Sequence, residues 1–156
     1  MSTTPQDVQN NIIDIDLSVL RKQRIRIDGD DNRIVELNLS DMDVMRRLQE
    51  AYERLTQLST KYHIQEESED DNTDEMIKAL QIIDTEMRQI VDYIFDSDVS
   101  NVAAPFGTMA DPINGRFRYD HIIEKFLDLY DTNFTKEFKQ MSKNVQKHTD
   151  KYTKRK

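Results

Sequence analysis

The chain has 156 residues, of which 37% are hydrophobic and 33% charged, so it has the length of one domain and an unusually polar composition. Its formal net charge of -8 disfavours binding of the whole chain to nucleic acid, because an acidic surface repels phosphate backbones. The longest stretch without Asp, Glu, Lys or Arg runs only from Val99 to Ala110, which is too short to span a bilayer. The chain has no cysteine, and its first residues lack the basic start and apolar core of a signal peptide. These features favour a cytoplasmic protein that binds no membrane.

Charge is distributed unevenly along the chain. Residues 136–156 contain eight Lys or Arg and two acids, a net charge of +6, which leaves -14 on the other 135 residues. A second block, 63–75, contains seven carboxylates and no Lys or Arg, and like-charge repulsion predicts a solvated linker there. We therefore expect a flexible N-terminus over 1–11, a single mainly helical domain over 12–135 that includes this linker, and a basic amphipathic C-terminal helix or tail over 136–156.

Alternating β-branched residues predict a β-hairpin near the start of this domain. Residues 24–28 and 33–37 alternate apolar and polar side chains around the turn-forming sequence Gly29-Asp30-Asp31-Asn32. Ile13, Ile15 and Leu17 alternate with polar residues in the same way and could supply a third strand, which an isolated hairpin would need for stability.

Apolar residues at helical spacing predict two long helices after the hairpin. The first covers about 41–62, with Ser40 as the expected N-cap. Its expected apolar face consists of Met45, Leu48, Tyr52, Leu55 and Tyr62. The second helix follows the acidic linker, with Asn72 as its expected N-cap. Its apolar residues repeat at intervals of four and three: Met76, Leu80, Ile83, Met87, Ile90 and Ile94.

Two prolines and two glycines between 104 and 115 predict that helical structure stops there. It resumes near Tyr119, where apolar residues again follow helical spacing up to Tyr130. The polar sequence Asp131-Thr132-Asn133 leaves open whether the last helix is separate. The expected fold class is mainly α, a helical domain of three to four helices with a small N-terminal β-hairpin element.

No motif of known chemistry is complete. The histidines lie singly in the sequence, without the paired spacing of a zinc site: His63, His121 and His148. Asp28, Asp30 and Asn32 match the first three ligand positions of an EF-hand loop, but Arg33 and Leu39 stand where Gly and Glu are required. A polar hairpin turn is therefore the preferred interpretation of these residues. We expect no catalytic residue, no metal and no cofactor, and the chain is predicted not to be an enzyme.

The sequence Arg116-Phe117-Arg118-Tyr119 interleaves cations and aromatic rings, as sites for single-stranded nucleic acid do. The preferred interpretation is a short extended segment in which Phe117 and Tyr119 pack onto the body and the two arginines lie in solvent. Nucleic acid is therefore not an expected partner.

The C-terminal segment has the most specific pattern in the chain. At 100° per residue six side chains lie within about 40° of one line on the helix. They are Phe134, Phe138, Met141, Val145, His148 and Tyr152. Six lysines lie on the opposite side: Lys136, Lys139, Lys143, Lys147, Lys151 and Lys154.

Such a helix can dock on the protein's own core, on a partner helix or on an anionic membrane. The acidic body and the absence of Trp and Leu from the stripe disfavour the membrane. The first two alternatives stay open. The candidate partner-binding residues are Phe134, Phe138, Met141, Val145, Tyr152, Lys139, Lys143 and Lys147.

Two parts of the chain carry a family resemblance. They are 25–52 with the preceding Ile15-Asp16-Leu17-Ser18, and the later stretch from 93–98 through 113–117. These stretches resemble small proteins of the tail-gene module in long-tailed phages and prophages of Gram-positive bacteria, so the chain resembles a phage tail-assembly chaperone. Between its outermost residues, 15 and 117, the resemblance spans about two thirds of the chain, and it does not extend to the basic segment from Lys136 onward.

The resemblance implies a mainly helical protein that coats the tape-measure protein before the tail tube polymerises. It therefore implies a long helical protein partner and residence in the host cytoplasm, and the stripe on the C-terminal segment adds self-association as a second possibility. Five methionines suit such adaptable binding: Met42, Met45, Met76, Met87 and Met141. Ordinary core filling is the preferred interpretation for Met76 and Met87. A structural virion protein, such as a tail-completion or connector component, and a small host-directed regulatory protein stay open as alternatives.

Overall fold

The computed structural model describes residues 11–62 and 73–154, with side chains up to residue 147. In chain order its elements are η1 (Ser18–Leu20), β1 (Gln23–Ile27), β2 (Asp30–Leu37), α2 (Val44–Tyr62), α3 (Thr73–Phe95), α4 (Ser100–Ala103), β3 (Pro112–Ile113), β4 (Arg116–Phe117) and α5 (Arg118–Lys154). This architecture confirms the predicted fold class, mainly α with a small N-terminal β-hairpin.

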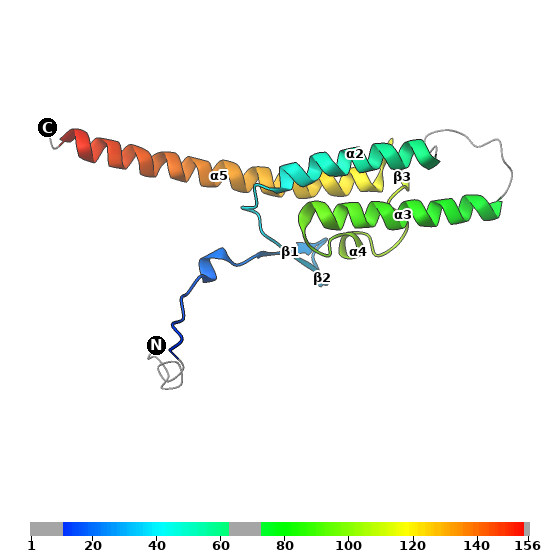
Figure 1. Ribbon diagram of the computed structural model, residues 1–156, viewed down its shortest axis with the longest axis horizontal. Helices are drawn as coiled ribbons and strands as arrows, with labels where there is room; N and C mark the ends of the chain where they lie inside the picture. The colour runs from blue at the N-terminus through cyan, green and yellow to red at the C-terminus, as the bar shows by residue number, and fades with distance from the viewer. Residues whose placement is uncertain (1–10, 63–72, 155–156) are drawn as a thin grey trace.

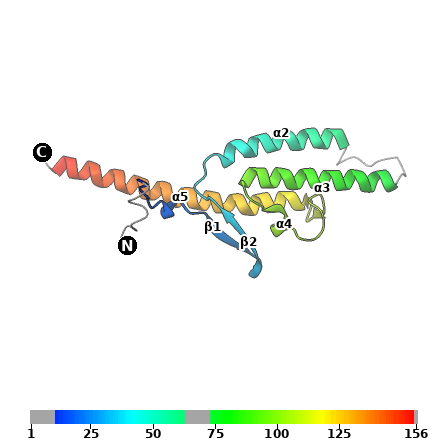
Figure 2. The same cartoon turned by 60° about the horizontal axis from the view of Figure 1, so that its bottom comes forward.

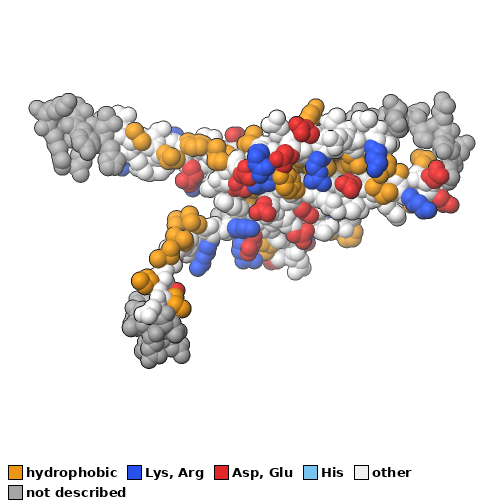
Figure 3. All heavy atoms as spheres, viewed as in Figure 1, with side chains coloured by type: hydrophobic (Ala, Val, Ile, Leu, Met, Phe, Trp, Pro, Cys, Tyr) orange, Lys and Arg blue, Asp and Glu red, His pale blue; other side chains and the backbone are white. Residues whose placement is uncertain are grey.

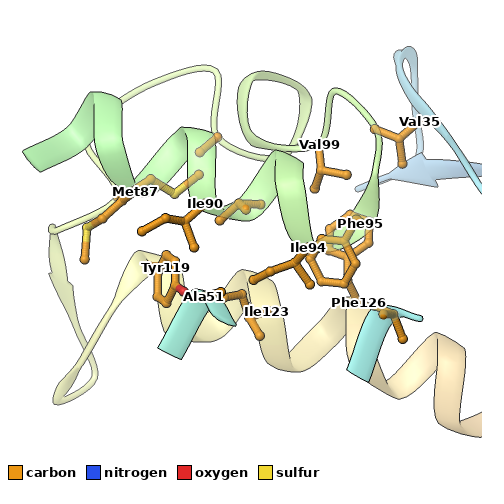
Figure 4. Packing of buried hydrophobic residues seen from close by; sticks show 14 of the residues in the cluster. Val35, Ala51, Met87, Ile90, Ile94, Phe95, Val99, Tyr119, Ile123 and Phe126 are labelled. Carbon is orange, nitrogen blue, oxygen red and sulfur yellow. The ribbon is translucent and has the colours of Figure 1, made fainter. Parts of the chain in front are cut away.

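Three helices form the body of the molecule. Helices α2, α3 and the first half of α5 lie side by side, with α2 antiparallel to the other two (Figures 1 and 2). Figure 4 shows Ile90 and Ile94 of α3 pointing toward Tyr119 and Ile123 of α5. Near the end of α3 the ring of Phe95 packs against the rings of Phe126 and Tyr130, with centroids 5.4 and 5.8 Å apart. The apolar face that α3 was predicted to have is therefore buried from Ile83 onward.

The β-hairpin packs on one end of this bundle. Its strands pair antiparallel, and the turn residues Asp28 and Gly29 have φ of 53° and 70°, values typical of a type I′ turn. Val35 and Leu37 of β2 are buried, whereas Arg33 donates hydrogen bonds of 2.9 Å to two carbonyl oxygens of α4. The hairpin is therefore held by apolar contact on one side and by a cation on the other.

The predicted third strand is wrong. Residues 12–17 form no strand, and the side chains of Ile13 and Ile15 are 89% and 76% exposed. This segment leaves the body as an extended arm, shown in dark blue in Figure 1. Alternation of apolar and polar residues predicts strand geometry, but a strand forms only where another strand offers its backbone groups.

Helix α2 begins three residues later than predicted, because Asp41 and Asp43 form a polar turn in which the Asp43 amide donates to the Asp41 carboxylate. The predicted apolar face is partly wrong, since Met45 and Tyr52 are 56% and 72% exposed. The buried residues of α2 are instead Val44, Arg47, Ala51 and Leu58. Helix α3 packs against the face of α2 that carries these buried residues, and this face is rotated around the helix axis from the predicted apolar face.

One helix boundary differs from the predicted one, and a question that the sequence left open is settled. Helix α3 begins at Thr73, so residues 73–75 are helical and not part of a linker. Residues 1–10 and 63–72, which include the predicted cap Asn72, lie outside the described residues. Helix α5 continues through Asp131–Asn133 without a break. The side chain of Asn133 donates to the carbonyl oxygen of Leu39 at 3.0 Å, so it does not compete with the backbone of its own helix.

Candidate partner-binding surface

Helix α5 extends well beyond the body. Its 37 residues correspond to about 55 Å of helix, of which the first half lies in the core. The hydrogen bond from Asn133 to Leu39 ties α5 to the chain before α2. Every described side chain from 135 to 147 is exposed. Residues 135–154, the α5 extension, therefore project from the bundle as a single helix (Figure 1).

The predicted stripe residues begin at the edge of the core and continue into solvent. Phe134 is half-buried, and its ring lies 6.1 Å from that of Tyr130 and 6.4 Å from that of Phe138. Phe138, Met141 and Val145 are 50%, 57% and 65% exposed. Docking of these three residues on the protein's own core is therefore wrong, because α2 and α3 do not reach so far along α5 (Figures 1 and 2).

The lysines named as partner-binding residues are also exposed: Lys139, Lys143 and Lys147. The side chains of His148 and Tyr152 lie outside those described. In Figure 3 apolar side chains form a line along the α5 extension. We call Phe138, Met141 and Val145 the α5 seam.

The spacing of the α5 seam is that of a coiled coil. From Phe134 the apolar residues follow at intervals of four, three and four, which is the a and d pattern of a heptad repeat. The positions beside the seam hold Thr135, Glu137, Ser142 and Asn144. The described lysines occupy outer positions, away from the seam. A seam this narrow matches the width of one partner helix better than that of a sheet.

Burial keeps Tyr130, just before the α5 extension, in its neutral form. The Tyr130 ring packs between Phe95 and Phe134, and burial raises the pKa of its phenol to about 12. Tyr130 therefore stays neutral and acts as an apolar anchor. The described part of the extension, 135–147, then adds four lysines and one glutamate, so the projecting helix is basic.

Buried arginines form a second group of polar residues, which the sequence patterns did not reveal. Arg88 on α3 donates to the carbonyl oxygens of Ala104 and Gly107 at 2.9 and 3.0 Å. It also pairs with Asp84 one turn earlier at 3.0 Å. Asp84 and Arg88 lie four residues apart on a predicted helix, and this spacing predicts an ion pair on the helix surface. It does not predict the contacts of Arg88 with the loop after α4. These contacts hold the loop after α4 against α3, so the cluster is structural.

Arg47 has a similar role on α2. Its guanidinium donates to the carbonyl oxygen of Ile94 at 2.9 Å and to the carboxylates of Asp41 and Asp43. The side chain is 10% exposed, and each charge in the group has an opposite charge beside it. The arrangement closes the end of α3 and leaves no room for a substrate between the carboxylates and the arginine.

The four residues 116–119 do not form an open cationic surface. Phe117 is half-buried and Tyr119 is buried, as predicted. Arg118, however, is only partly exposed, because it donates to the carbonyl oxygen of Thr108 and pairs with Asp111 at 3.1 Å. Arg116 pairs with Glu124. Both cations are therefore neutralised by carboxylates of the same chain.

The remaining candidate ligands are engaged within the protein. His121 Nε2 lies 2.7 Å from the carbonyl oxygen of Ile113, and the Asp28 carboxylate pairs with Arg33 at 3.1 Å. His63 lies outside the described residues. Among the described side chains, within 11–62 and 73–147, no three His, Cys, Asp or Glu residues are grouped to hold a metal ion. Among the same residues no helix is long and apolar enough to cross a bilayer.

The chain matches no known family model, no curated protein and no solved structure. The α5 extension is the candidate functional surface, because its apolar side chains are exposed at regular spacing.

Proposed function

We propose that this protein is a non-enzymatic phage tail-assembly chaperone that binds the tape-measure protein in the host cytoplasm through the α5 seam. The observation that supports the proposal most is the exposure of Phe138 and Met141 at heptad spacing on a helix that has left its own core. The family resemblance of 25–52 and 93–117 supplies the biological setting.

The chemistry of the seam fits a helical client. A tape-measure protein is a long helical chain whose apolar stripes would aggregate if they were exposed. A helix that offers an apolar seam can cover such a stripe turn by turn, as helices in coiled coils do. Phe138 supplies a large contact area, and the flexible thioether of Met141 adapts to clients of varied sequence.

The polar faces of the extension fit the same function. Lys139, Lys143 and Lys147 lie away from the seam, so they keep the chaperone and its client in solution while the apolar side is covered. A reversible contact needs no catalytic group, and the polar clusters around Arg47 and Arg88 serve the fold.

The test is co-purification of this protein with a tape-measure protein from the same tail-gene module. Replacing Phe138 and Met141 together by Asp places two charges in the seam, and burying an unpaired charge is strongly unfavourable. We expect loss of co-purification, with a melting temperature within about 2 °C of that of the unchanged protein, because neither side chain is in the core.

The matched control replaces Gln140 and Gln146 by Asp, which adds the same charge to the same helix outside the seam. This control should still capture the tape-measure protein. Capture that survives the double change at Phe138 and Met141 would contradict the proposal. Retention of the protein in purified mature particles would instead favour a structural virion protein, because an assembly chaperone leaves before the tail is complete.

A further inference from the structure

Helix α3 also extends beyond the helices that it packs against, at the end of the bundle opposite the α5 extension. In Figure 4 the first turn of α5 lies beside Ile90, so the first turns of α3 extend past the start of α5 (Figures 1 and 2). We call residues 73–82 the α3 overhang. They correspond to about 15 Å of helix. Met76, Ile77 and Leu80 on this overhang are each 48% exposed.

The α3 overhang continues a face that α5 already covers farther along. Met76 and Leu80 share the heptad spacing of Ile83, Met87, Ile90 and Ile94, which are buried in the core. Helix α5 lies along this face and points in the same direction as α3 (Figure 1). Another helix in that orientation would therefore cover Met76 and Leu80 in the way that α5 covers Ile90 and Ile94.

The two overhangs carry opposite charge. The α3 overhang contains Asp74 and Glu75 against one lysine, Lys78, so its net charge is negative. The described part of the α5 extension contains four lysines and one glutamate. Opposite charges at the two ends of one molecule favour contact between unlike ends and disfavour contact between like ends.

We propose that the α5 extension of one copy docks on the α3 overhang of a second copy, so that the protein self-associates head to tail. The α5 seam then lies on Met76 and Leu80, parallel to α3, in the same relation that α5 and α3 have inside each bundle. Such a contact is heterologous, and repeated addition gives an open string of copies. The neighbouring copy covers the seam until a client helix displaces it. The contact uses the same seam as the proposed client site but does not depend on that function.

Sedimentation of the full chain tests this contact with two variants. Met141→Glu damages only the docking helix, and Leu80→Glu damages only the overhang that receives it. Both residues are about half-exposed, and glutamate is a good helix former, so both variants should keep the wild-type circular dichroism spectrum. We expect the weight-average mass of the unchanged protein to rise with concentration beyond twice 18.5 kDa and to fall back as salt increases.

Each variant alone should remain at the monomer mass. An equal mixture of the two should form dimers, because the intact α5 seam of Leu80→Glu can dock on the intact overhang of Met141→Glu. The control Ile82→Glu, an exposed position on α3 outside the heptad line, should associate like the unchanged protein.

Three results would overturn the inference. They are a monomeric wild-type protein at all concentrations, association of Leu80→Glu that equals the wild type, and a mixture that stays monomeric. None of these results contradicts the client proposal, that is, binding of the tape-measure protein through the α5 seam. Leu80→Glu retains this seam and should still capture the tape-measure protein. An unchanged protein that self-associates normally but fails to capture the tape-measure protein would instead remove the client proposal alone.

Discussion

At the scale of single residues, arginines hold the irregular parts of the fold to the helices. Arg33 reaches the carbonyl oxygens at the end of α4, Arg47 reaches that of Ile94, and Arg88 reaches those of Ala104 and Gly107. Each of these oxygens would otherwise need water at the edge of the core. Because a guanidinium has five donors in one plane, one side chain can satisfy several carbonyl groups at once.

Replacing Arg88 by Ala should lower the free energy of unfolding by about 2–4 kcal/mol, since the change removes charge-assisted hydrogen bonds to a half-buried loop. Urea unfolding measures the effect. Arg46→Ala is the matched control, because Arg46 pairs with Asp43 and Glu50 on an exposed surface and its loss should cost less than about 1 kcal/mol. Equal losses for the two variants would contradict the structural role of Arg88.

Asp111 makes stability depend on acid pH. Hydrogen bonds from the hydroxyl and amide of Thr108 and from Arg118 lower its pKa to about 2. Since the folded-state pKa lies below the ordinary value of about 3.8, the carboxylate stabilises the fold above that value. This stabilisation is lost as the pH falls from about 4 toward 2.

Replacing Asp111 by Asn should therefore reduce stability at pH 7 and weaken its decline between pH 4 and 2. Unfolding midpoints across this range measure both effects. Asp131→Asn, on the exposed side of α5, is the control and should follow the unchanged protein. A decline in the Asp111 variant as steep as in the unchanged protein would show that other carboxylates cause the acid dependence.

At the scale of elements, α5 is one continuous helix with a buried first half and an exposed second half. Its first half contributes Tyr119, Ile123, Phe126 and Tyr130 to the core, and its second half exposes residues of the same chemical kind. The apolar residues continue past Tyr130 at intervals of three and four, and the extent of α2 and α3 separates buried from exposed positions. The two halves should therefore respond differently to the same substitution.

Phe126→Ala should lower the free energy of unfolding by about 3–5 kcal/mol, because the ring is 5% exposed and its removal leaves a cavity. Phe138→Ala should cost less than about 1 kcal/mol in dilute protein, since that ring is 50% exposed. Thermal or urea unfolding of the two variants at low concentration makes the comparison. Similar losses would mean that Phe138 is buried by the body.

At the scale of the whole molecule, apolar side chains leave the bundle in three directions. The α5 extension and the α3 overhang lie at opposite ends, and the N-terminal arm exposes Ile13, Ile15 and Val19 (Figures 1 and 3). None of the buried core residues comes from the arm. The arm thus belongs to the surface of the molecule and not to its folding unit.

Removing residues 1–17 should leave the melting temperature within about 2 °C of that of the full chain, because the described residues in this segment, 11–17, contribute nothing to the core. Differential scanning calorimetry at low protein concentration measures this. A fall of more than about 5 °C would mean that the arm packs on the body.

The sequence alone was enough to predict the hairpin and the long helices of the body, but it does not reveal α4 or the β3–β4 pair and leaves open whether 136–156 forms a helix or a tail. Heptad spacing from Met76 to Ile94 defines the apolar face of α3, and Gly29 marks the hairpin turn. The predicted turn at 29–32 is too long, because the strands are joined by Asp28 and Gly29 alone and β2 already begins at Asp30. These are local properties, because periodicity and turn chemistry act over a few residues. The same pattern predicted the separation of Phe138 and Met141 from the lysines.

Only the tertiary structure decided which apolar residues are covered. Leu80 and Ile83 share one face and one spacing, yet Leu80 is 48% exposed and Ile83 is 3% exposed. The spacing and type of residues in a helix show that one of its faces is apolar. Whether another helix covers that face depends on where the other helix, distant in the sequence, begins and ends. The contact of Arg88 with Gly107 has the same origin, since the loop is brought to α3 by folding of the whole chain. The exposed ends of α3 and α5 result from this mismatch in helix length.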